Sequence, residues 1–127
     1  MRTRRLLFPG LLVALMLGFG MQACATTGGR SQPRAATVEI VNHNFANMTV
    51  YAISDGGSAR RLGTAGGLDS TTLTLPYDIF ASGSVNLVAV PLAGFGAAGS
   101  GPVNVQSGQT IRFTIEADLN MSSVVVR

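Results

Sequence analysis

Few side chains in this 127-residue sequence could carry out covalent or metal chemistry. There is one cysteine, Cys24, one histidine, His43, and no tryptophan. A zinc site built on His43 would have to draw carboxylates from scattered positions, because no ligand-spacing motif surrounds it. A Ser-His-Asp triad would depend on the same histidine, and no nucleophile-elbow sequence accompanies it. We therefore predict that His43 is a solvated turn residue, and we predict no catalytic residue, metal site or cofactor.

A glycine pattern at residues 94–99 is the next candidate for chemistry. It reads Gly-Phe-Gly-Ala-Ala-Gly and matches the Gly-x-Gly-x-x-Gly signature of dinucleotide-binding loops. That signature works only when its last glycine opens a helix whose amides face a pyrophosphate. Here Ser100-Gly101-Pro102-Val103 follows, which breaks a helix and begins a strand. We therefore predict a flexible glycine loop that joins two strands.

The same loop supports a sharper hypothesis. Loops at the ends of β-sandwiches often carry function, so we expect an apolar loop tip that contacts a partner or a lipid surface. Its residues are Leu92, Phe95, Ala97 and Ala98.

Charged residues offer two further candidates. Arg60 and Arg61 could contact phosphate or carboxylate, and we name them with Phe95 as candidate contact residues. A charged edge strand that discourages aggregation is the commoner use of such an arginine pair. Glu39 and Glu116 could act as paired acids in glycosidic chemistry, but both occupy polar positions of predicted strands, where a solvated face explains them. An envelope hydrolase with an unrecognised carboxylate site is therefore the alternative to a non-enzymatic domain.

The N-terminal segment has the layout of a secretory signal. Residues 1–5 contain three arginines, and residues 6–21 form an apolar run that carries no charge. A membrane-spanning helix needs about 20 apolar residues, and this shorter run is also interrupted by proline and glycine. A cleaved signal peptide is therefore favoured over a permanent transmembrane helix.

The end of this signal, Met21-Gln22-Ala23-Cys24, resembles the lipobox of bacterial lipoproteins. Ala23 and Cys24 match the motif, Met21 is a tolerated apolar variant, and Gln22 departs from it. The resemblance implies a signal peptide over residues 1–23, cleavage before Cys24 and a diacylglycerol, often with a further acyl chain such as palmitate, on the new N-terminal cysteine. Two alternatives stay open, namely ordinary signal cleavage after Ala25 and an unpaired thiol.

The same resemblance predicts a location in the cell envelope. Because Ala25 rather than Asp follows the cysteine, it implies the outer membrane facing the periplasm, or the cell surface in a host with one membrane. From Cys24 onward, six arginines balance six acidic residues, so the excess of positive charge belongs to the signal. This balance provides no excess of basic residues that would bind the phosphate backbone of a nucleic acid. The expected partners are the membrane, through the lipid anchor, and another envelope protein.

The remainder of the chain divides into a tether and a β-rich domain. Residues 24–36 contain a small, polar stretch with glycine and proline, which predicts a flexible tether. Residues 37–127 contain short runs of Val, Ile, Leu and Thr separated by turn residues, which indicates strands. The predicted strands are 37–42, 48–54, 59–64, 70–75, 85–91, 102–106, 109–117 and 122–127.

These strands predict an all-β, antiparallel β-sandwich of immunoglobulin-like or fibronectin-like type, with a small barrel as alternative. In residues 111–116, Ile111, Phe113 and Ile115 alternate with polar residues and are expected to face the core. The apolar runs in 85–91 and 122–127 are expected to be covered on both faces, and residues 76–80 to form one helical turn. The domain also resembles small uncharacterised β-rich bacterial lipoproteins, and we predict a non-enzymatic binding or structural module.

Overall fold

The computed structural model describes residues 33–127, and Cys24 with the predicted signal lies outside the described residues. Eight strands and two single turns of helix follow one another along this part of the chain. The strands are β1 (Ala36–Asn42), β2 (Met48–Ser54), β3 (Ala59–Ala65), β4 (Ser70–Leu75), β5 (Val85–Pro91), β6 (Ala98–Val103), β7 (Thr110–Ile115) and β8 (Ser123–Val126). The helical turns are α1 (Tyr77–Phe80), as predicted, and the 3-10 turn η1 (Leu119–Met121).

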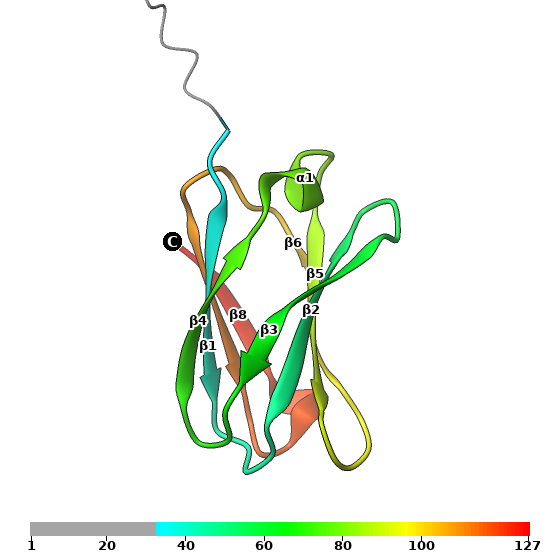
Figure 1. Ribbon diagram of the computed structural model, residues 1–127, viewed down its shortest axis with the longest axis vertical. Helices are drawn as coiled ribbons and strands as arrows, with labels where there is room; N and C mark the ends of the chain where they lie inside the picture. The colour runs from blue at the N-terminus through cyan, green and yellow to red at the C-terminus, as the bar shows by residue number, and fades with distance from the viewer. Residues whose placement is uncertain (1–32) are drawn as a thin grey trace, which may run out of the picture. The chain divides into compact units, whose positions relative to one another are not determined.

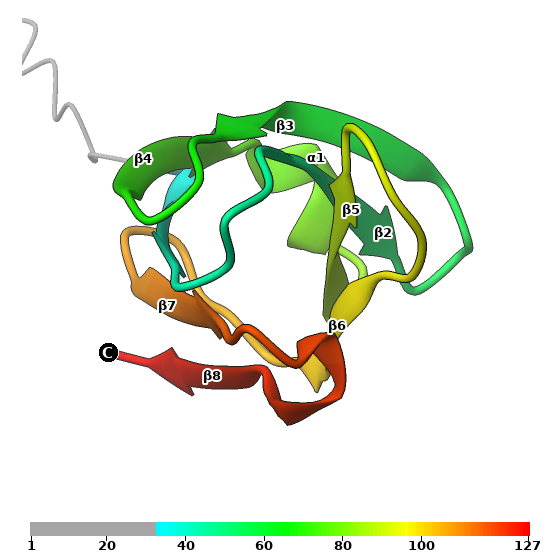
Figure 2. The ribbon, with the colours of Figure 1, turned by 90° about the horizontal axis from the view of Figure 1, so that it is seen from below.

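The strands form two separate four-stranded sheets, ordered β4-β1-β7-β8 and β3-β2-β5-β6. Figures 1 and 2 show these sheets as the two layers of a sandwich. The predicted two-sheet sandwich is therefore confirmed, and a single closed barrel is excluded. All pairings are antiparallel except that of β1 with β7, which is parallel. The order also differs from an immunoglobulin constant-type domain, where strands A, B, E and D form one sheet and C, F and G the other.

The core lies between the inner faces of the two sheets. On β7, Ile111, Phe113 and Ile115 are fully buried, which confirms the predicted face of this strand. They lie beside Val38 and Ile40 of β1, because the parallel register pairs Val38 with Ile111 and Ile40 with Phe113. The second sheet contributes its own buried set, Met48, Val50, Ala52, Val85, Leu87 and Ala89. Period-two alternation thus sends one face of each sheet into the core.

The prediction for β6 was displaced along the chain. The strand runs from Ala98 to Val103 rather than over 102–106. Glycine has a low intrinsic preference for strands, so the sequence reads as loop until Pro102. Pairing with β5 overrides that preference, and the ladder continues past a register irregularity near Leu87. There the Leu87 N–H donates to the Ser100 hydroxyl at 2.8 Å, which supplies a bond that the irregular ladder omits.

The expectation that two apolar strands are covered on both faces was wrong. Along β5, buried residues alternate with partly exposed ones, so this central strand is covered on one face. Strand β8 lies at the end of its sheet, and Val125 remains 54% exposed. Runs of valine reflect the preference of β-branched residues for extended backbone, and only the packing of the sheets decides which of them are buried.

The connections between strands gather at the two ends of the sandwich (Figure 1). The chain enters β1 at one end, where α1 also lies. The opposite end holds four connections, at residues 43–47, 66–69, 92–97 and 116–122, which we call the distal loops. In residues 33–127, no helix is long and apolar enough to cross a membrane.

The position of Phe113 gives a test of the core. Phe113→Ala should lower the free energy of unfolding by about 3–5 kcal/mol, because it removes a fully buried ring and leaves a cavity. Arg112→Ala changes the other face of the same strand and should cost at most about 1 kcal/mol, because its ion pair with Glu39 is partly exposed. Urea unfolding of both variants measures the difference. Equal losses would contradict the register of β7.

Candidate functional site

The distal loops are organised around the side chain of Asn42, the last residue of β1. Asn42 is 1% exposed. Its amide nitrogen donates to the carbonyl oxygens of Ala46 at 2.9 Å and Gly66 at 3.0 Å. Its amide oxygen accepts a hydrogen bond from the backbone N–H of Asn44 at 2.9 Å. One buried side chain therefore holds its own loop and also the 66–69 loop.

Asn44 and Asn47 extend this arrangement to the other loops. The Asn44 side chain donates to the carbonyl of Ala117 at 3.1 Å, and its oxygen accepts from the Ala46 N–H at 2.9 Å. The Asn47 side chain accepts from the Gly67 N–H at 2.9 Å. The Asn47 backbone carbonyl accepts from the N–H of Leu92 at 2.9 Å. The other three distal loops are therefore all hydrogen-bonded to residues 42–47, which we call the asparagine cluster.

Backbone contacts draw two of these loops unusually close. A Cβ atom placed on Gly67 would lie 2.1 Å from the carbonyl oxygen of Phe45, so only glycine fits there. The next residue, Leu68, has a positive φ of 54°, which is uncommon for a bulky residue and costs about 1–2 kcal/mol. Its N–H donates to the Asn44 carbonyl at 2.9 Å. This contact holds Leu68 in a conformation that the leucine would otherwise disfavour.

The distal loops carry most of the large apolar side chains that face solvent. Five of these side chains are at least 60% exposed, whereas the other large exposed apolar residues, Tyr77, Val90 and Val125, reach 54% at most. Phe95 is fully exposed. Isolated exposed apolar residues are ordinary, whereas clusters mark interaction sites. These five lie on loops at the same end of the sandwich (Figure 1), which makes that end the candidate site. The five, which we call the apolar tips, are Phe45, Leu68, Leu92, Phe95 and Met121.

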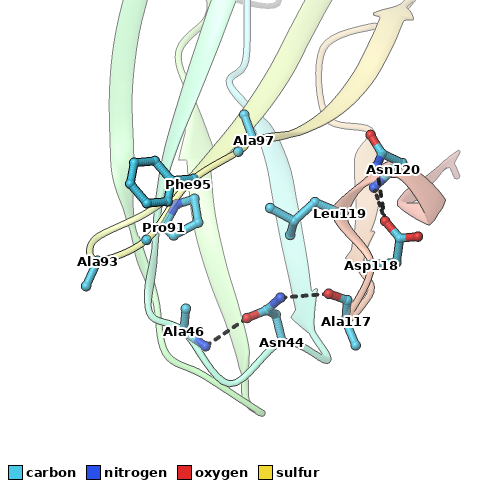
Figure 3. Close-up of a pocket in the computed structure, with 12 residues that line it drawn as sticks. Asn44, Ala46, Pro91, Ala93, Phe95, Ala97, Ala117, Asp118, Leu119 and Asn120 are labelled. Atoms are coloured by element: carbon cyan, nitrogen blue, oxygen red, sulfur yellow. Dashed lines mark hydrogen bonds between the residues drawn. The ribbon is translucent and has the colours of Figure 1, made fainter.

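A hollow of about 400 Å³ lies beside Phe95, between the 92–97 loop and the segment that contains η1. Figure 3 shows Leu119 reaching from η1 towards the 92–97 loop, with Asn44 linked to Ala46 and Ala117 below it. A Cβ on Gly96 would lie 3.3 Å from Leu119 Cδ1, so the two walls approach closely. Asp118 and Asn120 supply polar groups at the rim. More of the exposed lining of the hollow is polar than apolar, which distinguishes it from the mostly apolar pockets that bind small molecules.

The charge of the distal loops has one sign. Their sequence includes Asp69, Glu116 and Asp118 and no arginine or lysine. His43 Nδ1 lies 3.1 Å from Glu116 Oε2, with both side chains open to solvent. His43 is thus exposed at the turn, as predicted, and it also has a carboxylate neighbour that the sequence did not reveal. Within residues 33–127, no group of three or more His, Cys, Asp or Glu residues is placed to hold a metal ion.

The two candidate acids lie apart. Glu39 of β1 pairs with Arg112 of β7 through contacts of 3.1 and 3.2 Å, whereas Glu116 lies beside His43. Because Arg112 and Glu116 are four positions apart on one extended segment, the backbone positions of the two acids lie about 13 Å apart along the strand. Each carboxylate is also held by a different partner, so the two do not converge on one bond as glycosidase acids do.

The named contact residues do not form one site. Arg60 and Arg61 lie on β3, which is a sheet edge, as the charged-edge interpretation expected. Arg60 pairs with Asp78 of α1 at 2.9 Å, and Arg61 donates to Thr64 at 3.0 Å. α1 is at the end opposite the distal loops (Figure 1). Phe95 therefore belongs to a different surface from the two arginines.

The glycine motif forms a loop followed by a strand. Residues 92–97 are loop and β6 begins at Ala98, so no helix follows to present amides to a phosphate. Leu92, Phe95 and Ala97 are exposed as predicted for an apolar tip, but Ala98 is buried in the core. Ala98 was misplaced because β6 begins four residues earlier than predicted.

Sequence reasoning missed the asparagine cluster and three apolar tips, Phe45, Leu68 and Met121. One signal was present: Asn42, Asn44 and Asn47 occur within six residues, and asparagine side chains often satisfy loop backbone groups. The apolar tips carried no such signal, because they come from loops far apart in sequence.

No protein-family model matches the chain, and no curated protein matches it. Among solved structures, it is similar to an NMR structure of a protein from Eubacterium rectale, at 13% sequence identity and a TM-score of 0.45. That match covers 73% of this chain and 88% of the other.

Removing the Asn42 side chain should destabilise the distal loops. Asn42→Ala leaves the Ala46 and Gly66 carbonyls and the Asn44 N–H without their partner, so the free energy of unfolding should fall by about 3 kcal/mol. Asn120→Ala removes an exposed asparagine and should change it by less than about 0.5 kcal/mol. Urea unfolding, together with hydrogen exchange of the Leu68 amide, measures both effects. Equal stability of the two variants would show that the cluster contributes nothing.

The close approach at Gly67 gives an independent test. Gly67→Ala forces the new methyl group against the Phe45 carbonyl, and the resulting shift should cost about 1–3 kcal/mol. Gly99→Ala is the matched control, because no atom lies within 4 Å of the added methyl group. Thermal melts compare the two. A control variant that melts below Gly67→Ala would contradict the loop contact.

Proposed function

We propose that this protein is a lipid-anchored lipoprotein of the bacterial cell envelope whose β-sandwich is a non-enzymatic binding module. The observation that carries the binding role is the set of apolar tips. Five large side chains are held in water at one end of the sandwich, away from the end at which the chain enters β1 (Figure 1). Their exposure is unfavourable unless a partner covers them, because burying apolar surface stabilises a complex by about 25 cal/mol per Å².

The asparagine cluster suits these loops to binding. Ordering a flexible loop on association costs free energy, and a loop that is already ordered avoids that cost. Here the hydrogen bonds of Asn42, Asn44 and Asn47 order the loops in the unbound chain. The apolar tips are therefore presented in a fixed arrangement, which favours binding of a specific partner over non-specific hydrophobic association.

The anchor rests on the sequence around Cys24. Met21-Gln22-Ala23-Cys24 follows a signal-like segment, and a lipidated Cys24 would hold the chain durably once it carries more than one acyl chain. The tether between Cys24 and Ala36 can reach at most about 40 Å when extended. The tether joins the domain at the end where β1 begins, and the distal loops lie at the opposite end of the domain (Figure 1). We propose the outer membrane facing the periplasm, or the cell surface in a host with one membrane.

An envelope hydrolase is the less supported candidate. Acid–base hydrolysis of glycosides needs two carboxyl groups that converge on one bond. Among the described residues, Glu39 is paired with Arg112 and Glu116 with His43. The hollow beside Phe95 has one carboxylate at its rim, Asp118. This arrangement supports recognition rather than hydrolysis.

Cys24 gives the test of the anchor. In a bacterial host, the wild-type chain should partition with membranes, and the peptide that begins at Cys24 should show a mass increase of lipid size. Cys24→Ala removes the thiol that forms the thioether and should abolish that increase. Mass spectrometry of the N-terminal peptide after membrane fractionation measures both.

Two further results sharpen this test. Val125→Ala changes an exposed residue of β8, leaves the lipobox unchanged and should keep the lipid. An unmodified wild-type protein that begins at Thr26 would instead establish ordinary signal cleavage after Ala25 and would overturn the anchor.

A further inference from the structure

We propose that the distal loops dock a polypeptide partner that presents apolar side chains flanked by arginine or lysine. This inference rests on the proposed binding function and specifies the chemistry of the partner. The apolar tips would be covered by the partner's apolar residues, and one of these would enter the hollow beside Phe95.

The charge distribution selects a basic partner. The distal loops contain three carboxylates and no arginine or lysine. The five arginines within residues 33–127 all lie outside these loops, at positions 34, 60, 61, 112 and 127. Complementary charge around an apolar centre raises association rates and gives specificity. A partner with acidic side chains around its apolar centre would be repelled.

Asp118 shows how a basic group would be held. It lines the hollow, and its Oδ1 atom accepts from the backbone and side-chain nitrogens of Asn120 at 3.0 and 3.2 Å. Within the described part of the chain, its Oδ2 atom has no hydrogen-bond donor. A partner's guanidinium or ammonium group could bind Oδ2 while the neighbouring apolar side chain packs between Phe95 and Leu119.

The size of the hollow fits a side chain. About 400 Å³ is near the lower end of the range for small-molecule pockets. The apolar tips, however, come from all four loops at this end, which is a broader surface than a small molecule would cover. A polypeptide can fill the hollow and contact the tips at the same time.

A lipid surface fits these loops less well. Anionic headgroups favour basic protein surfaces. The three carboxylates of the distal loops would oppose insertion into such headgroups. Binding to lipid is therefore an outcome that the experiment must distinguish.

Selection from a random 12-residue peptide display library tests the proposal. The full chain, as its host processes it, is held through a tag placed after Arg127, away from the distal loops. Selected peptides should combine Leu, Ile, Phe or Trp with at least two basic residues. Selected peptides that are apolar but lack basic residues would overturn the partner chemistry while leaving the binding module intact. Failure to select any peptide would overturn the docking surface.

Single-residue variants then test which residues of the distal loops contact a selected peptide. Phe95→Ser should weaken binding of a selected peptide by at least about tenfold, whereas Val125→Ser, an exposed apolar residue of β8, should leave it unchanged. Asp118→Asn keeps an oxygen that can cap η1 but loses the charge, so binding should weaken several-fold and become less sensitive to salt. Asp55→Asn at the other end is its control. Equal effects of each variant and its control would overturn the assignment.

Because the sequence has no tryptophan, Phe95→Trp places a single fluorescent indole on the tip. A selected peptide that itself contains no tryptophan should shift its emission to shorter wavelength. Vesicles of brominated phosphatidylcholine and phosphatidylglycerol should not quench it, and strong quenching would show that the tips insert into lipid instead. Whether the lipid anchor is present is measured separately, by the mass of the N-terminal peptide that contains Cys24, so failure of the anchor is distinguished from failure of peptide binding.

Discussion

The buried side chain of Asn42 is the contact on which the distal loops depend. Loops lack the regular ladders of sheets, and their buried backbone groups still require hydrogen-bond partners. Asn42 supplies two donors and one acceptor to such groups from the last position of β1, where the core places it out of water. A buried polar group is favourable only when it is satisfied, so the amide and the loops stabilise one another.

This arrangement connects the core to the distal loops. β1 is central in its sheet, between β4 and β7, so its C-terminal end is held firmly. The asparagine cluster carries that order into loops that display Phe45, Leu68 and Phe95 to solvent. The backbone of Leu68 even adopts a left-handed conformation, and strained residues of this kind gather at functional sites because the surroundings hold them there.

Local patterns predicted most of the strands, and tertiary pairing accounts for the errors. β2, β4 and β5 have the predicted bounds, because β-branched runs end at clear turn residues. β6 was misplaced because its glycines look like loop, and only pairing with β5 makes them strand. Arg112 and Glu39 each looked like solvated residues, since nothing local indicates that β1 and β7 pair in parallel and bring them within 3.1 Å.

The sequence by itself determined the all-β class and the buried face of β7, because period-two alternation is a local property of the chain. It also placed Phe95 at an exposed loop tip and carries the lipobox-like motif at Cys24. Only the tertiary structure decided that Phe45, Leu68, Leu92, Phe95 and Met121 lie on loops at one end of the sandwich, together with the three carboxylates of these loops (Figure 1). These residues come from four loops, and their proximity depends on strand order and on the hydrogen bonds of Asn42, neither of which local sequence encodes.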